Sequence, residues 1–225
     1  MTLNGRKKWF LIVPLCIASV PFIIALGVHF MPAKTHDEKA VVWVGQFNSD
    51  NLAKFRSELQ KRPEITAVEF RDSPGGKVMV ADEVQRLIIS RNLNTYARGQ
   101  CLSACADTFL RGRTHTLLPS RFGSPTFLAL HPMHAMGERN SGGTDIENRK
   151  IVANSGGKIP LVLLDRMYDA IDLKRGGIYI FPSEQKTSRG KGHVLFCRGN
   201  EKKLFADCEP ISGYTPASLG ISVIK

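Results

Sequence analysis

Residues 65–76 read ITAVEFRDSPGG and combine a short apolar strand with a glycine-rich turn. The run Ile65–Phe70 has the length and the branched and aromatic residues of a strand. Ser73-Pro74-Gly75-Gly76 carries the residues of a tight turn. The helix expected after the turn has its apolar residues on one face: Val80, Val84, Leu87 and Ile88. A strand, a turn and a helix in this order are typical of an α/β domain.

The same alternation of strands and helices continues on both sides of this stretch. Further strands are expected over residues 41–44, 95–97, 115–118 and 126–130, and helices over residues 50–62, 101–110 and 161–171. Such alternation predicts a largely parallel sheet with right-handed crossovers. From residue 183 the chain is rich in Gly, Lys and Ser, so residues 183–225 are expected to form a C-terminal β extension.

The composition is that of a globular protein. The chain has 225 residues, enough for one medium domain but too few for two large ones. Apolar residues make up 43% and charged residues 23%, which argues against disorder. The net charge of +11 suits an anionic surface, but no block of five like charges occurs. A nucleic-acid partner is therefore not expected.

The N-terminal residues predict a membrane anchor. Residues 9–30 contain no Asp, Glu, Lys or Arg, and a helix of about 20 apolar residues spans a bilayer. The basic residues Arg6, Lys7 and Lys8 precede this run and place residues 1–8 in the cytoplasm. We expect a signal-anchor over residues 9–30, a linker over residues 31–40, and a single-pass inner-membrane protein with its domain in the periplasm. Because a cleaved signal also has an apolar core, a secreted periplasmic domain is the alternative.

The cysteines on the exported side suggest disulfides. They are Cys101, Cys105, Cys197 and Cys208, an even set in a compartment where disulfides persist. The spacings lack the paired C-x2-C of a structural zinc site, so no metal is expected. Cys197 and Cys208 flank a turn signal, which suits a bond that closes a hairpin. Cys101 and Cys105 are four residues apart, a spacing that permits a bond on a helix without favouring it over other pairings or free thiols.

Several short segments contain groups that could catalyse a reaction. Ser103 begins an expected helix, where a serine is most often a cap. The Ala104 N–H and the helix dipole could also stabilise an oxyanion formed at Ser103. Gly75 and Gly76 let a backbone N–H approach a ligand closely, although such glycines commonly serve only the turn. His131 ends an apolar strand, and histidine is the usual base that activates a serine.

Taken in order, these segments resemble the Clp protease proteolytic subunit. The matching pieces are Ser73–Gly76, Gly99–Ala104, Leu118–Arg121, His131-Pro132 and Gly142–Glu147. The resemblance covers roughly residues 40–182 and is closest to exported ClpP-like proteins with Cys-x-Ser-Ala-Cys at the nucleophile turn. It implies a ClpP/crotonase-like spiral of ββα units, with the ClpP-like domain over residues 41–182.

The resemblance implies a role for each matching residue. Ser103 would be the nucleophile and His131 the general base. The oxyanion hole would consist of the Ala104 N–H and that of Gly75 or Gly76.

A third residue should orient the histidine, and here the chain is shorter than the family pattern. Asp172 is the nearest acid before the aromatic–aliphatic strand Ile178–Phe181, and Asp169 is the next. We therefore expect Asp172 in this role. Loss of the third member lowers the activity of a Ser–His pair without removing it.

The function implied by the resemblance is a membrane-anchored periplasmic serine peptidase that hydrolyses peptides or proteins without a cofactor. It also implies a homo-oligomer. The membrane anchor replaces the family's segments that dock an unfoldase, so no ATP-driven partner is expected. A catalytically inactive ClpP-fold protein that oligomerises or binds partners is the main alternative. A crotonase-type acyl-thioester enzyme is disfavoured because its chemistry needs the two N–H groups but no Ser–His pair.

Overall fold

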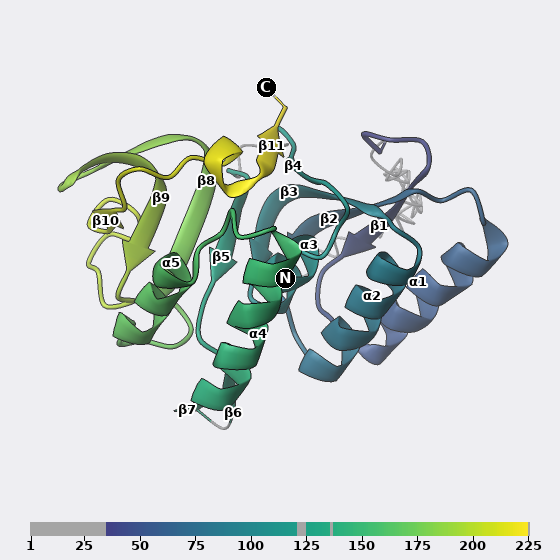
Figure 1. Ribbon diagram of the computed structural model, residues 1–225, viewed down its shortest axis with the longest axis horizontal. Coiled ribbons are helices and arrows are strands. Elements are labelled where there is room, and N and C mark those ends of the chain that lie inside the picture. Colours follow the sequence, from purple (N-terminus) through teal and green to yellow (C-terminus); the bar gives the residue numbers. More distant parts are fainter. Residues whose placement is uncertain (1–34, 121–124, 136, 225) are drawn as a thin grey trace, which may run out of the picture. The chain divides into compact units, whose positions relative to one another are not determined.

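A nine-stranded mixed sheet is the centre of the part of the chain that the structure describes, a computed structural model covering residues 35–120, 125–135 and 137–224 (Figure 1). The strands follow the order β1-β2-β3-β5-β8-β9-β10, with β4 beside β3 and β11 beside β4. Their bounds are β1 Ala40–Val44, β2 Ala67–Ser73, β3 Asn94–Leu102, β4 His115–Leu117, β5 Phe127–Leu130, β8 Gly177–Thr187, β9 Gly190–Cys197, β10 Glu209–Pro210 and β11 Ile221–Val223. A separate ribbon pairs β6 (His134–Ala135) with β7 (Glu138–Arg139).

The longer helices lie along one side of this sheet (Figure 1). Their bounds are α1 Ser49–Lys61, α2 Val78–Ser90, α3 Ala104–Phe109, α4 Ser141–Asn154 and α5 Leu161–Asp165, with 3-10 turns at η1 Arg166–Asp169 and η2 Ala217–Leu219. Asn48 begins α1 by accepting a hydrogen bond from the Asn51 N–H. α2 buries Val80, Val84 and Ile88 at helical spacing against the sheet.

The predicted α/β class is confirmed, and one half of the sheet is parallel as expected. β1, β2, β3 and β5 pair in parallel, and β4 and β11 join them in the same direction. The other half corrects the prediction of a largely parallel sheet, because β8, β9 and β10 are antiparallel to their neighbours. β8 begins where β5 ends, with Ile178 opposite Leu130. Gly177 permits this close start, since a Cβ there would lie 2.1 Å from the Leu130 carbonyl oxygen.

Two predicted helices differ from the observed ones. The helix expected over residues 101–110 begins only at Ala104, because Cys101 and Leu102 still pair with β5 as the end of β3. The helix expected over residues 161–171 ends its α-helical part at Asp165 and continues as η1, and Ile171 is exposed. The helix α4 was not predicted, since its glycine-rich first turn resembles a loop.

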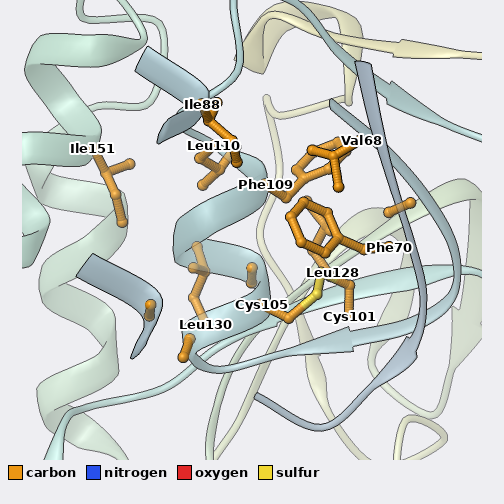
Figure 2. Packing of buried hydrophobic residues seen from close by; sticks show 14 of the residues in the cluster. Val68, Phe70, Ile88, Cys101, Cys105, Phe109, Leu110, Leu128, Leu130 and Ile151 are labelled. Atoms are coloured by element: carbon orange, nitrogen blue, oxygen red, sulfur yellow. A yellow bond between two sulfur atoms is a disulfide. The ribbon is translucent and has the colours of Figure 1, made fainter. Parts of the chain in front are cut away.

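The main hydrophobic core lies between the helices and the sheet. Figure 2 shows side chains from β2, α2, α3 and β5 gathered around Phe109, which is fully buried. The Cys101–Cys105 disulfide lies in the same cluster. A second cluster packs Phe127, Tyr179 and Phe181 against the C-terminal strands. The short helix α3 is therefore fixed on several sides, and so is the turn that precedes it.

The C-terminal residues contribute strands at two places in the sheet. β8 runs across residue 182, where the sequence analysis placed a domain boundary, and continues into the hairpin with β9. β11 instead pairs with β4.

The signal-anchor predicted over residues 9–30, the segment before it and residues 31–34 of the predicted linker lie outside the described residues, and Ala40 at the end of that linker begins β1. Within the residues that are described, we find no helix with both the length and the apolar character needed to cross a bilayer.

Candidate active site

Three of the segments singled out in the sequence meet at one edge of the sheet. The Ser73–Gly76 turn follows β2, Ser103 follows β3, and His131 follows β5. β2, β3 and β5 are neighbours and run in parallel, so their carboxyl ends lie together. Ligand sites of open α/β sheets are commonly found outside these strand ends.

Ser103 occupies a backbone conformation that is rare for an L-residue, with φ 55° and ψ −129°. Its N–H donates to the Ala129 carbonyl oxygen at 2.8 Å, which holds the turn against β5. Its hydroxyl makes no capping bond to α3, although Ser103 stands at the cap position. The usual role of a serine at a helix start therefore does not account for Ser103. Such backbone strain costs of the order of 1–3 kcal/mol and clusters at functional sites.

The glycine turn packs directly on Ser103. A Cβ on Gly75, which has φ +84°, would lie 2.8 Å from the Ser103 Cβ and 2.7 Å from the Leu102 carbonyl oxygen. The Gly75 N–H donates weakly to the Ser73 Oγ at 3.4 Å. Among the described residues, no acceptor contacts the N–H of Gly76 or of Ala104. These two N–H groups are therefore available to a ligand beside Ser103.

His131 and a second histidine, His134, lie on the same side of Ser103. All three line a cavity of about 150 Å³ and a neighbouring groove of about 820 Å³. The His131 Nδ1 lies 3.0 Å from the Pro132 carbonyl oxygen. Because a carbonyl can only accept, Nδ1 carries the proton and Nε2 keeps its lone pair. The His134 Nδ1 is buried and has no partner among the described residues.

The environment keeps the His131 ring neutral. Burial lowers the pKa of His131 below its usual 6.5, and His134 lowers it further, while the bond to the Pro132 carbonyl opposes the shift. No hydrogen bond joins His131 to Ser103 in the described part of the chain. Catalytic hydrogen bonds often form only when a substrate binds, so a Ser103–His131 pair does not require this bond in the free protein.

Asp172 is not joined to His131. Its Oδ1 accepts hydrogen bonds from the Lys174 N–H at 2.8 Å and the Arg175 N–H at 3.1 Å. These bonds, above all that from Lys174, hold the pKa of Asp172 below its usual value. Asp169, the next candidate, pairs with Arg166 instead. The expected Asp172–His131 contact is thus absent from the described residues, because the carboxylate caps its own turn.

The 820 Å³ groove extends from Ser103 across the second hydrophobic cluster. Phe127, Tyr179 and Phe205 form its aromatic surface, and Lys174 and Arg175 lie at its border. The groove borders the carboxyl ends of β3 and β5 through Leu102 and Leu130.

Four polar residues to which the sequence analysis assigned no individual role line the smaller cavity. They are Asp107 from α3, Asp82 and Gln85 from α2, and Glu147 from α4. The one signal in the sequence is spacing, since Asp107 follows Ser103 by four residues and a helix brings such positions to one face. No three His, Cys, Asp or Glu side chains gather as a metal-binding group in the described ranges.

The four cysteines of the described residues form two disulfides. Cys101 and Cys105 are bonded with their Cα atoms 5.2 Å apart, and Cys197 and Cys208 with theirs 4.7 Å apart. The pairings that the sequence left open are thereby decided. The first bond joins the end of β3 to α3 across Ser103 and is completely buried, so it restrains the turn on which Ser103 lies.

Removing either disulfide is expected to lower the free energy of unfolding, but only removal of Cys101–Cys105 should also slow the reaction of Ser103. The Cys101→Ala/Cys105→Ala variant should lose about 2 kcal/mol of unfolding free energy, and the Cys197→Ala/Cys208→Ala variant about 3, because the second bond closes a longer loop. Reaction of Ser103 with a fluorophosphonate should nevertheless slow at least about tenfold only in the first variant, since small displacements of reacting groups are costly. Denaturant unfolding and labelling rates measure both effects. Equal slowing in the two variants would contradict a local restraint.

The comparisons with known proteins add little. No known protein family and no curated protein matches the sequence. Among solved structures, the chain is similar to a serine-to-alanine mutant of the 1510-N membrane-bound stomatin-specific protease, with 13% identity and a TM-score of 0.41. The match covers 52% of this chain and 63% of that one. A likeness this slight carries no argument. The mixed α/β sheet itself is consistent with the predicted ClpP-like fold.

Proposed function

We propose that this protein is a ClpP-like serine peptidase with Ser103 as nucleophile and His131 as general base. The observation that carries the proposal is the conformation of Ser103. Ser103 has a strained backbone and a hydroxyl that makes no capping bond, and it lines a cavity that His131 also lines. Backbone strain of this kind clusters at functional sites, and a nucleophile needs an exposed oxygen beside a base.

The chemistry follows from the atoms at the site. The Ser103 Oγ attacks the carbonyl carbon of the substrate, and its proton passes to the His131 Nε2. The tetrahedral oxyanion accepts hydrogen bonds from the Gly76 and Ala104 N–H groups. The imidazolium returns its proton to the leaving amine, and an acyl-enzyme remains. Water then attacks the acyl carbon and gives a proton to His131. When the C–O bond to Ser103 breaks, the imidazolium returns this proton to the Ser103 Oγ, and the acid is released.

The Pro132 carbonyl takes over part of the role expected of Asp172. It accepts the Nδ1 proton of His131 and so fixes the tautomer in which Nε2 is the base. A carbonyl stabilises the imidazolium less than a carboxylate does, because it carries no full charge. We therefore expect a slower peptidase than one with a complete Ser-His-Asp triad.

The proposal includes the location of the domain, its substrates and its assembly. We propose anchoring in the inner membrane by residues 9–30, with the domain in the periplasm, where the two disulfides would persist. Peptide or protein substrates would bind along the groove as extended chains. Homo-oligomers are expected, and no ATP-driven unfoldase is required.

A binding protein without activity is the second candidate. Exposed apolar side chains on α2 favour it, because Met79 is 84% and Ile89 57% exposed. Such residues suit contacts with other chains.

Labelling of Ser103 tests the proposed function. The full chain, purified in detergent, is treated with a fluorescent fluorophosphonate, which reacts with activated serines. The wild type and the Ser90→Ala control, which alters an exposed serine on α2, should label equally. Ser103→Ala should not label. Absence of labelling in the folded wild type would favour the binding protein, and labelling that persists in Ser103→Ala would mean that another residue is the nucleophile.

A further inference from the structure

Asp107 is an unpaired carboxyl group one helical turn beyond Ser103. Both residues line the 150 Å³ cavity, and Asp107 is half-buried on α3. Its side chain makes no hydrogen bond or ion pair among the described residues. A carboxyl group withdrawn from water without a partner is unfavourable, so its position in this cavity needs an explanation.

The two other carboxylates of the cavity, Asp82 and Glu147, have cationic partners outside it. Glu147 accepts from the Arg111 Nη2 at 2.5 Å and from the Lys150 Nζ at 3.3 Å. Arg111 also donates to the Gln85 side chain, and Lys150 lies 3.8 Å from Asp82. Arg111 and Lys150 thus pair with Glu147 and Asp82, and no cation of the described residues pairs with Asp107.

Titration of Asp107 agrees with this imbalance. Burial raises the pKa of Asp107 to about 8, and the Glu147 carboxylate raises it too, while Arg111 and Lys150 oppose the shift. The titratable and charged groups around Asp107 are Asp82, Glu147, Arg111, Lys150, His131 and His134. At neutral pH most Asp107 side chains therefore hold a proton, which a bound cation would displace.

The walls of the cavity suit a long side chain with a charged end. Val78 and Ala81 from α2 and Met133 supply apolar surface, along which a methylene stem can pack. A metal ion would need several converging ligands, and no such group occurs in the described ranges. A purely apolar side chain would leave Asp107 buried without a partner.

From this geometry we infer that the cavity is the subsite for a lysine or arginine side chain adjacent to the scissile bond. The inference rests on the proposed peptidase function and names its substrate class. The ammonium or guanidinium group pairs with the ionised Asp107, and the proton of Asp107 leaves to solvent. The substrate's carbonyl then lies beside Ser103, one helical turn away.

Hydrolysis tests the inference in the active protein. Matched fluorogenic peptides that differ only in lysine or norleucine beside the scissile bond are compared with the full chain in detergent. The lysine peptide should have at least about a tenfold higher kcat/KM, and Asp107→Asn should reduce this ratio to nearly one. The control Asp50→Asn removes an exposed carboxylate on α1 and should retain the preference. A ratio near one in the wild type would overturn the inference.

Binding tests it without catalysis. Benzamidine, an apolar ring with a cationic amidine, is titrated calorimetrically into Ser103→Ala at pH 7 in buffers of different ionisation enthalpy. Binding should release nearly one proton, and adding Asp107→Asn should weaken it at least about tenfold and abolish the release. Circular dichroism confirms that the variants are folded. Labelled Ser103 without benzamidine binding would overturn the subsite alone, whereas binding without labelling would support the subsite and contradict the peptidase.

Discussion

The His131→Ala variant is expected to react with a fluorophosphonate about 10²–10⁴-fold more slowly than the wild type, because general-base assistance typically contributes this much. The Ser103 hydroxyl would then have to lose its proton to water. His134→Ala is the matched control, since both rings line the same cavity and their centroids are 5.4 Å apart. It should slow labelling only a few-fold. The opposite ranking of the two variants would make His134 the base.

The pH dependence of the same reaction identifies the base independently. Neutral His131 accepts the proton, and burial lowers the pKa of His131 from 6.5. The labelling rate should therefore rise with pH through a midpoint below 6.5 and be level near pH 7. In His134→Ala the midpoint should move upward, because the neighbouring ring no longer disfavours a charged His131. A midpoint above 7 in the wild type would contradict a buried imidazole as base.

The Gly75→Ala variant is expected to label about 10²–10³-fold more slowly, the effect of losing one oxyanion donor. The added methyl group would lie within 3.0 Å of three atoms of the nucleophile turn, so this turn or the glycine turn must shift. Either shift separates the Gly76 and Ala104 N–H groups from the oxyanion. The labelling rate of the folded variant measures the effect.

Gly45→Ala is the control for backbone strain. Gly45 has φ +78°, close to the +84° of Gly75, but nothing lies within 4 Å of its added Cβ. Both variants should lose stability, of the order of 1 kcal/mol from the left-handed conformation alone. Only Gly75→Ala should also lose reactivity. Equal reactivity of the two variants would show that the contact between the turns is unimportant.

The first strands of the parallel half could be predicted from the sequence because β1 and β2 are each followed by an amphipathic helix that returns the chain, α1 and α2. The antiparallel half could not. Residues 177–187 are an apolar run that turns polar, and such a run does not reveal its direction. The direction of β8 depends on the path of the chain between β5 and β8, which contains α4 and α5. The first turn of α4 contains two glycines and resembles a loop in the sequence.

The candidate site residues that follow parallel strands could be predicted from the sequence, and those outside the parallel half could not. Ser103, His131 and the glycine turn could be grouped because each follows a parallel strand, and the ends of neighbouring parallel strands meet. Asp172 precedes an antiparallel strand, so no such rule places it, and its carboxylate caps its own turn. Asp107 escaped notice because its importance comes from an absent partner, which only the packing of α2 and α4 against α3 reveals.

The pairing of β11 with β4 has a consequence for the order of folding. Ile221 lies opposite His115, so a strand from the last part of the described chain completes the sheet beside β3, which leads to Ser103. Contacts between residues so distant in sequence form slowly, because the long intervening loop must close first. The helices and the β1–β3 unit can assemble from contacts that are close in sequence, while the edge of β4 stays unpaired until β11 binds to it. The sheet is therefore expected to close last at its β4 edge, after the β1–β3 unit that leads to Ser103 has formed.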